Sequence, residues 1–79
     1  MEFKTKGVCS SKIIFDLVDG KVSNVQFVGG CNGNLKGIGA LVEGQKAEDV
    51  IARLEGITCG FKATSCPDQL AKALREATK

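Results

Sequence analysis

The sequence predicts an α+β fold, in which a small three-stranded antiparallel sheet is followed by three helices packed on one face. In the first third of the chain, apolar residues alternate with a period of two, which is typical of strands. After Gly29-Gly30 the apolar residues change to helical spacing. Strands that all precede the helices favour an α+β layout over alternating strands and helices. A chain of 79 residues has room for one core, so we expect a single domain over residues 1–79.

The predicted sheet is centred on a hairpin. Its three strands are expected over Phe3–Val8, Lys12–Val18 and Lys21–Val28. Asp19-Gly20 predicts a two-residue turn between the last two strands, because both residue types accept positive φ angles. Val22 breaks the alternation of the returning strand. This break predicts either a bulge near Ser23 or a short twisted start to the strand.

Three helices are predicted from apolar residues at helical spacing. The residues that mark them are Leu35, Ile38, Leu41 and Val42 for the first helix, Ala47, Val50, Ile51 and Leu54 for the second, and Leu70, Ala71, Leu74 and Ala77 for the third. Gly44 and Gly56 are expected to end the first two helices. Gly37 and Gly39 lie inside the first helix, where glycine is unfavourable, so they predict close packing against a neighbouring backbone.

The third helix has a well-marked start. Ser65 or Cys66 can serve as its N-cap, because small polar residues accept hydrogen bonds from the first unpaired N–H groups. Pro67 suits the first turn, and Asp68 complements the positive end of the helix dipole. Residues from 57 to 64 are expected to form an irregular connection before this start.

The composition argues against several classes of function. Eleven basic and nine acidic residues give a net charge of +2, and Tyr and Trp are absent, so nucleic-acid binding by base stacking is not expected. No apolar stretch is long enough to span a bilayer, and the first residues lack the apolar core of a secretory signal. We therefore expect a cytoplasmic protein that does not bind membranes. Thiols stay reduced in that compartment, which disfavours a disulfide framework.

The candidate functional residues are four cysteines, Cys9, Cys31, Cys59 and Cys66. The chain has no histidine, so these thiols are its soft ligands, and four thiolates make a complete set for one zinc ion or one iron-sulfur cluster. No C-x-x-C pair is present, so the ligands would have to converge from separate elements. Cys31 and Cys66 lie at predicted helix starts, where the helix dipole stabilises a thiolate.

Two other interpretations of the cysteines remain open. Free cysteines are often small buried apolar residues with no ligand role. Alternatively, Cys59 and Cys66 could cycle through a disulfide in a thiol-redox protein. Hydrolysis by a cysteine nucleophile is not expected, because without histidine there is no Cys–His pair.

The glycines near the cysteines fit a site that the backbone approaches closely. Gly30, Gly33 and Gly60 are expected to permit this approach at a metal site. The segment from Gly29 to Asn34 could also cradle an anion before a helix, but it lacks the patterns of the known phosphate-binding loops. A tight turn that aims Cys31 explains the same residues.

Several motifs in order along the chain resemble the TSCPD domain family, in particular its small stand-alone branch with four cysteines. The matching segments are Gly29-Gly30-Cys31-Asn32-Gly33-Asn34, Leu41-Val42-Glu43-Gly44, Leu54-Glu55-Gly56-Ile57-Thr58-Cys59-Gly60 and Thr64-Ser65-Cys66-Pro67-Asp68. The resemblance implies an association with ribonucleotide reductases, because TSCPD domains occur in the C-terminal part of the adenosylcobalamin-dependent enzymes. The catalytic barrel of such an enzyme cannot fit in 79 residues, so we expect no catalysis by this chain alone.

A more distant resemblance concerns iron-sulfur cluster assembly scaffolds. Their layout is similar, with one cysteine before the sheet hairpin, one at a strand-to-helix junction and one at the start of the last helix, here Cys9, Cys31 and Cys66. This chain differs from the scaffolds at two places. Ser10-Ser11 stands where the scaffolds carry an acidic residue, and Cys59 would replace their histidine ligand.

Together these observations predict a metal-binding accessory module that acts with a ribonucleotide reductase in DNA precursor synthesis. Cys9, Cys31, Cys59 and Cys66 are its expected ligands, and zinc is the first choice of metal. An iron-sulfur cluster is the second choice, in a scaffold or carrier.

Overall fold

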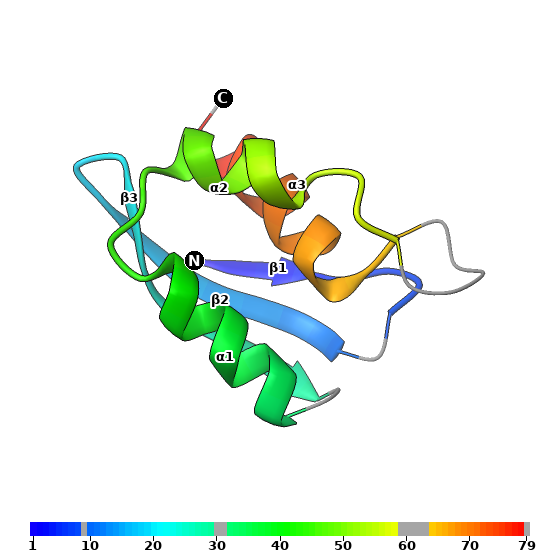
Figure 1. Ribbon diagram of the computed structural model, residues 1–79. Helices are drawn as coiled ribbons and strands as arrows, with labels where there is room; N and C mark the ends of the chain where they lie inside the picture. Colours follow the sequence, from blue (N-terminus) through cyan, green and yellow to red (C-terminus); the bar gives the residue numbers. More distant parts are fainter. Residues whose placement is uncertain (9, 30–31, 59–63, 79) are drawn as a thin grey trace.

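The computed structural model describes residues 1–8, 10–29, 32–58 and 64–78, and it has the predicted α+β layout (Figure 1). The strands pair antiparallel in the order β1-β2-β3, and the helices follow them in the sequence. The elements are β1 (Glu2–Lys4), β2 (Ser10–Val18), β3 (Lys21–Gly29), α1 (Asn32–Val42), α2 (Ala47–Leu54) and α3 (Cys66–Ala77).

The hairpin between β2 and β3 has the predicted two-residue turn. Asp19 and Gly20 have φ angles of 53° and 78°, so both lie in the left-handed region that this turn requires. The turn also contacts the start of α2, because the Ala47 N–H donates to the Gly20 carbonyl over 2.9 Å. The hairpin thus positions α2 as well as the two long strands.

The break at Val22 is a β-bulge, as the first of the two sequence interpretations predicted. Two successive ladder pairs are Ile14–Gln26 and Asp16–Ser23, so β3 has one more residue than β2 between them. Asn24 lies within this interval and has a positive φ of 54°. The extra residue returns Val22 to the inner face, where it is fully buried.

The first strand is shorter than predicted, and the second begins earlier. β1 ends at Lys4 rather than Val8, because the chain turns away from the sheet at Gly7, which has a φ of 73°. β2 begins at Ser10 rather than Lys12, because a second irregularity between these residues lets Ser10 still pair with Gly29. Both differences occur at the end of the sheet where α3 begins.

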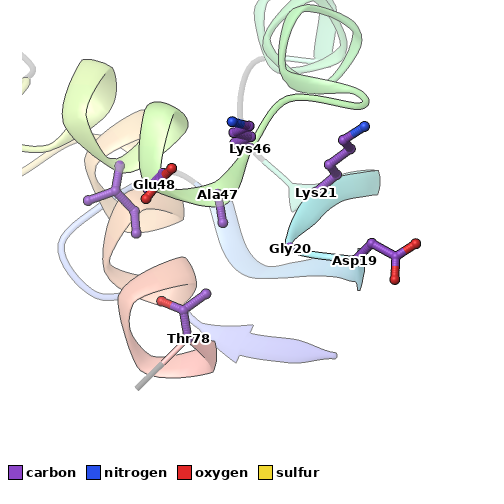
Figure 2. A pocket seen from close by; sticks show the side chains of 8 residues that line it. Asp19, Gly20, Lys21, Lys46, Ala47, Glu48 and Thr78 are labelled. Atoms are coloured by element: carbon purple, nitrogen blue, oxygen red, sulfur yellow. The ribbon is translucent and has the colours of Figure 1, made fainter.

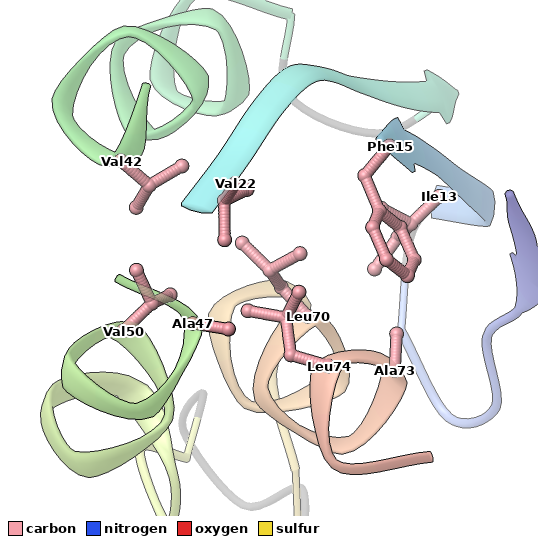
Figure 3. Close-up of a cluster of buried hydrophobic side chains, with 9 residues drawn as sticks. All are labelled: Ile13, Phe15, Val22, Val42, Ala47, Val50, Leu70, Ala73 and Leu74. Atoms are coloured by element: carbon pink, nitrogen blue, oxygen red, sulfur yellow. The ribbon is translucent and has the colours of Figure 1, made fainter. Parts of the chain in front are cut away.

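The core lies between the inner face of the sheet and the three helices, which confirms that the helices pack on one face (Figure 3). Its buried residues are Ile13, Phe15, Val22, Val42, Ala47, Val50, Leu70, Ala73 and Leu74. Leu70 and Leu74 of α3 are completely buried and lie in the middle of this cluster (Figure 3). The opposite face of the sheet leaves Val18 exposed by 59%.

Helix α1 differs from its prediction at one apolar position. Leu35, Gly39 and Val42 are buried, whereas Leu41 is 78% exposed and does not belong to the buried stripe. A Cβ atom added at Gly39 would lie 3.1 Å from the Val25 carbonyl oxygen, so the predicted close approach is confirmed there. At Gly37 an added Cβ atom would meet no atom within 4 Å, so the same prediction is wrong for that residue.

Helices α2 and α3 follow their predictions closely. Gly44 and Gly56 have φ angles of 77° and 87°, and they lie just beyond the ends of α1 and α2. Arg75 of α3 pairs with Glu55 at the end of α2, which joins the two helices at the surface. Among the residues that the structure describes, no helix is long and apolar enough to cross a membrane.

Candidate functional site

Of the four predicted ligands, Cys66 falls within the described residues, while Cys9, Cys31 and Cys59 lie outside them. Cys66 is the first residue of α3 and is partly exposed. Its Sγ atom lies 3.3 Å from the Oγ atom of Ser10, and either atom can donate the hydrogen bond. Within the described part of the chain, no group of three potential ligands that could hold a metal ion is present.

Ser10 connects Cys66 to two other parts of the chain. It is the first residue of β2, is 3% exposed, and pairs with Gly29 at the end of β3. Its carbonyl oxygen also accepts a hydrogen bond from the Thr5 hydroxyl in the connection between β1 and β2. Ser10 therefore holds the start of α3 against the end of the sheet.

The start of α3 is fixed by Ser65, one of the two predicted N-caps. Ser65 has an extended backbone, with φ −150° and ψ 170°, and its Oγ atom accepts from the Asp68 N–H over 3.2 Å. The same hydroxyl donates to the Ile57 carbonyl over 2.6 Å. The cap thus joins the residues before and after the connection from α2 to α3, and it determines where Cys66 begins the helix.

Asp68 is buried in the first turn of α3. It was predicted to complement the helix dipole, and its carboxylate also accepts several hydrogen bonds. Its carboxylate accepts from the Gly56 N–H over 2.7 Å, from the Thr64 hydroxyl, and from the Lys72 ammonium over 3.4 Å. Burial raises the pKa of Asp68, but the hydrogen bonds from Thr64, Gly56 and Lys72 outweigh burial and hold this pKa below its usual value. The carboxylate is therefore a charged anchor for the loop that precedes α3.

Gln69 extends these contacts to the N-terminal part of the chain. Its side chain is almost fully buried, accepts from the Lys6 N–H over 3.2 Å and donates to the Thr64 hydroxyl over 2.9 Å. Every buried side-chain polar atom among the described residues has a hydrogen-bond partner. We call Thr64, Ser65, Asp68 and Gln69 the cap network.

The cap network was only partly predicted. The sequence predicted Ser65 as one of two N-cap candidates and Asp68 in the first turn, but it predicted no contacts for Thr64 or Gln69. The available signal is the S-x-x-D pattern from Ser65 to Asp68, a form of the capping box. In the usual capping box the acidic side chain returns to the cap N–H, whereas here it binds Gly56 and Thr64.

The glycines proposed to let the backbone approach a site are only partly described. Gly30 and Gly60 lie outside the described residues. Gly33 is exposed, and an added Cβ atom there would meet no atom within 4 Å. No described residue therefore requires a glycine at position 33.

Two of the surface pockets lie near the hairpin turn and near the cap network, and neither has a cysteine among the described residues that line it. Figure 2 shows one of about 480 Å³, between the hairpin turn and the adjacent ends of α2 and α3, with Asp19, Lys21, Lys46 and Glu48 around it. Two acidic and two basic side chains surround it, and its residues Lys21 and Lys46 form an isolated antiparallel β-bridge, so the pocket marks where the hairpin packs against α2. The other pocket, of about 490 Å³, lies beside the cap network and is lined by Phe3, Lys4, Lys6, Gly7, Thr64, Gln69 and Lys72.

The geometry around Cys66 suits ligand binding better than nucleophilic catalysis. The hydrogen-bond partner of its thiol among the described residues is the Ser10 hydroxyl, and a hydroxyl is too weak a base to activate a thiol at neutral pH. The carboxylate of Asp68 is engaged by Gly56, Thr64 and Lys72. A hydroxyl that donates to a thiolate is, in contrast, a common outer contact of a metal ligand.

Comparison with known proteins agrees with the motifs in the sequence. The model of the TSCPD domain matches residues 1–78, which is essentially the whole chain. No curated protein and no solved structure matches it. Because the match covers both the sheet and the three helices, together with all four cysteines, this chain belongs to the TSCPD domain family.

Proposed function

We propose that this chain is a metal-binding accessory module associated with ribonucleotide reductase, in which Cys9, Cys31, Cys59 and Cys66 together bind one zinc ion. The link to the reductase rests on the resemblance of TSCPD domains to the C-terminal region of the adenosylcobalamin-dependent enzymes. In this role the chain catalyses no reaction on its own.

The observation that supports the metal site is the set of contacts that Cys66 and its helix cap make. Ser10 bonds to Cys66 and pairs with Gly29. In the sequence, Cys9 comes directly before Ser10, and Cys31 comes two positions after Gly29. Two steps along a chain span at most roughly 7 to 8 Å, and this short separation in sequence is the reason to propose Cys9 and Cys31 as ligands together with Cys66.

The fourth proposed ligand, Cys59, is close in sequence to a residue that contacts the helix cap. Ser65 comes directly before Cys66 and donates a hydrogen bond to the Ile57 carbonyl. Cys59 comes two positions after Ile57 in the sequence. Cys9 and Cys59 are therefore within two positions of a residue that contacts Cys66 or its cap, and Cys31 is within two positions of Gly29, which pairs with Ser10.

The donor set fits zinc. Four thiolates satisfy its preferred tetrahedral coordination, and the chain offers no histidine that could compete. The Ser10 hydroxyl would donate to the Cys66 thiolate and orient it. When bound, zinc would supply a crosslink between the sheet and α3, and such a crosslink adds folding free energy to a domain with a small core.

Metal analysis and an optical spectrum of anaerobically purified protein test this proposal. We expect one zinc per chain and no visible absorption. If iron and sulfide-to-iron charge-transfer bands are found instead, the cysteines bind an iron-sulfur cluster rather than zinc, and a scaffold role is favoured. Absence of any metal, with four thiols free to react, would refute the metal site.

Substitution of each cysteine separates ligands from core residues. Cys9→Ser, Cys31→Ser, Cys59→Ser and Cys66→Ser should each lower both the zinc content and the melting temperature, because all four thiols share one ion. Thr58→Ser is the matched control, since Thr58 is exposed and adjacent to Cys59. A cysteine whose replacement leaves both quantities unchanged is not a ligand.

The association with the reductase needs a separate measurement. We expect the zinc-loaded protein to bind a ribonucleotide reductase from the same organism in calorimetry, and to reduce no ribonucleotide without it. Ribonucleotide reduction by the chain alone would contradict an accessory role. Failure to bind would remove the reductase link and leave the metal site intact.

A further inference from the structure

A second surface lies between α1 and α2, and no cysteine is among the described residues that line it. It is a groove of about 430 Å³ in which the end of α1 forms one side and α2 the other. Its lining residues are Leu41, Val42, Gln45, Asp49, Val50, Arg53 and Leu54.

The groove combines an apolar floor with an exposed leucine. Val42 and Val50 are 7% and 3% exposed and form the floor, with the half-buried Leu54 beside them. Leu41 is 78% exposed, more than any other large apolar residue in the described part of the chain. A leucine on the surface next to an apolar floor is a feature that association with another protein surface would bury.

The charges beside the groove indicate which partner fits. Asp49 and Arg53 are one helical turn apart, and both are exposed. Within the described residues neither forms an ion pair, although Asp68 and Lys72 do so at the same spacing on α3. The two charges are therefore available to a partner, with a negative charge towards the start of α2 and a positive charge towards its end.

The charges on α2 are complementary to those on α2 of a second copy, if the two helices run antiparallel. When two copies of α2 lie antiparallel about a two-fold axis, Asp49 of each copy faces Arg53 of the partner subunit, so two opposite-charge pairs form at once. Because Leu41 lines the same groove as Val42 and Val50, two grooves that face each other would let each Leu41 cover the apolar floor of the other copy. A parallel arrangement would instead place like charges opposite each other.

We propose that the groove between α1 and α2 binds a second copy of this chain, so that the protein forms a two-fold symmetric dimer through antiparallel α2 helices. The interface consists of Leu41 on the apolar floor, flanked by the Asp49–Arg53 pairs. Dimers of this kind are common, because one surface patch serves both partners.

Charge reversal tests the dimer and its geometry together. Sedimentation velocity of the wild-type protein should show a species of twice the 8.3 kDa chain mass as the concentration rises. Asp49→Arg alone, or Arg53→Asp alone, places like charges at both pairs and should weaken dimerisation by about tenfold or more. The double variant Asp49→Arg/Arg53→Asp should regain it to within about threefold.

An equimolar mixture of the two single variants gives a sharper test. One copy then carries two arginines and the other two aspartates, so both pairs of a mixed dimer are attractive. We expect the mixture to dimerise about as tightly as the wild type, although each component alone dimerises about tenfold or more weakly. Failure of both the double variant and the mixture to regain the dimer would refute the antiparallel arrangement.

The apolar part of the interface has its own variant and control. Leu41→Ser should abolish the dimer while leaving the melting temperature of the monomer unchanged, because this side chain is exposed. Val18→Thr changes an exposed apolar residue on the open face of the sheet and should leave dimerisation unaltered. A wild-type protein that stays monomeric at millimolar concentration, or a Leu41→Ser dimer as tight as the wild type, would overturn the proposal.

Discussion

The thiol of Cys66 lies 3.3 Å from the hydroxyl of Ser10, although 56 positions separate the two residues in the sequence. This contact joins the first residue of α3 to the first residue of β2. Ser10 in turn pairs with Gly29, so the contact unites three chain segments at one end of the sheet. Any ligand held by Cys66 would be sensitive to the position of all three segments.

Ser10→Ala should weaken both the fold and the proposed metal site. The hydroxyl is buried and bonded, so its loss should lower the free energy of unfolding by about 1 kcal/mol in chemical denaturation. Zinc affinity, measured by competition with a chelator, should fall by about tenfold or more. Ser11→Ala is the matched control, because Ser11 is exposed and should change stability by less than about 0.5 kcal/mol. Equal effects of the two variants would contradict a special role for Ser10.

The parts of the fold that local chemistry determines could be predicted from the sequence. The Asp19-Gly20 turn follows from two residue types that accept positive φ, and the structure has both in that region. The bounds of α2 follow from its apolar spacing and from Gly56, and neither of these signals depends on contacts with the rest of the chain. The Ser65 cap is likewise a local feature.

Other parts depend on contacts between distant residues, which spacing does not reveal. Leu41 lies three positions after Ile38, so helical spacing allows these two residues to share one face. The buried face is instead the one that holds Leu35, Gly39 and Val42, because the helix packs its backbone against Val25 of β3. Spacing alone grouped Leu41 with its apolar neighbours, and only the sheet contact shows which face is buried.

The candidate site also has parts that the sequence predicts and parts that depend on contacts between distant residues. All four cysteines could be identified from the sequence, because thiols are rare and the chain has no histidine. The contacts of Asp68 and Gln69 could not, since these residues pair with Gly56 and Lys6, and Lys6 is 63 positions from Gln69. The roles of buried polar residues depend on what the fold brings next to them.

Asp68→Asn should alter the dependence of stability on pH. The pKa of Asp68 in the folded protein is below its ordinary value of 3.8, so the folded state binds this proton less readily than the unfolded chain. The resulting stabilisation is present above about pH 4 and is lost as the pH falls through the lower pKa of the folded protein. Urea denaturation at pH values from 7 to 2 should therefore show a smaller loss of stability on acidification for the variant than for the wild type.

The variant should also be less stable at pH 7, by about 1–3 kcal/mol, because it removes a buried charged acceptor. Asp19→Asn is the control, since Asp19 is exposed and its left-handed backbone also suits asparagine. If the two variants have the same pH profile, the hydrogen bonds of Asp68 do not govern the acid-dependent loss of stability.

Thr64→Val tests whether the cap network acts as a unit. Valine keeps the shape of threonine but removes the hydroxyl that donates to Asp68 and accepts from Gln69. Because Gln69 is buried, its amide would lose a partner, and the free energy of unfolding should fall by about 1–3 kcal/mol. Thr58→Val, at an exposed position of the same connection, should have an effect below about 0.5 kcal/mol. A Thr64→Val protein as stable as the control would show that the network contributes little.

Two glycines in α1 should respond oppositely to alanine. At Gly37 an added methyl group has open space, so Gly37→Ala should raise the free energy of unfolding by up to about 1 kcal/mol, the difference in helix propensity. At Gly39 the same methyl group would lie 3.1 Å from the Val25 carbonyl oxygen, and a backbone atom of a strand yields less readily than a side chain. Gly39→Ala should therefore be less stable than Gly37→Ala by about 1 kcal/mol or more, as measured by thermal and chemical denaturation. Because each variant is the control for the other, equal stabilities would mean that α1 does not depend on close packing against β3.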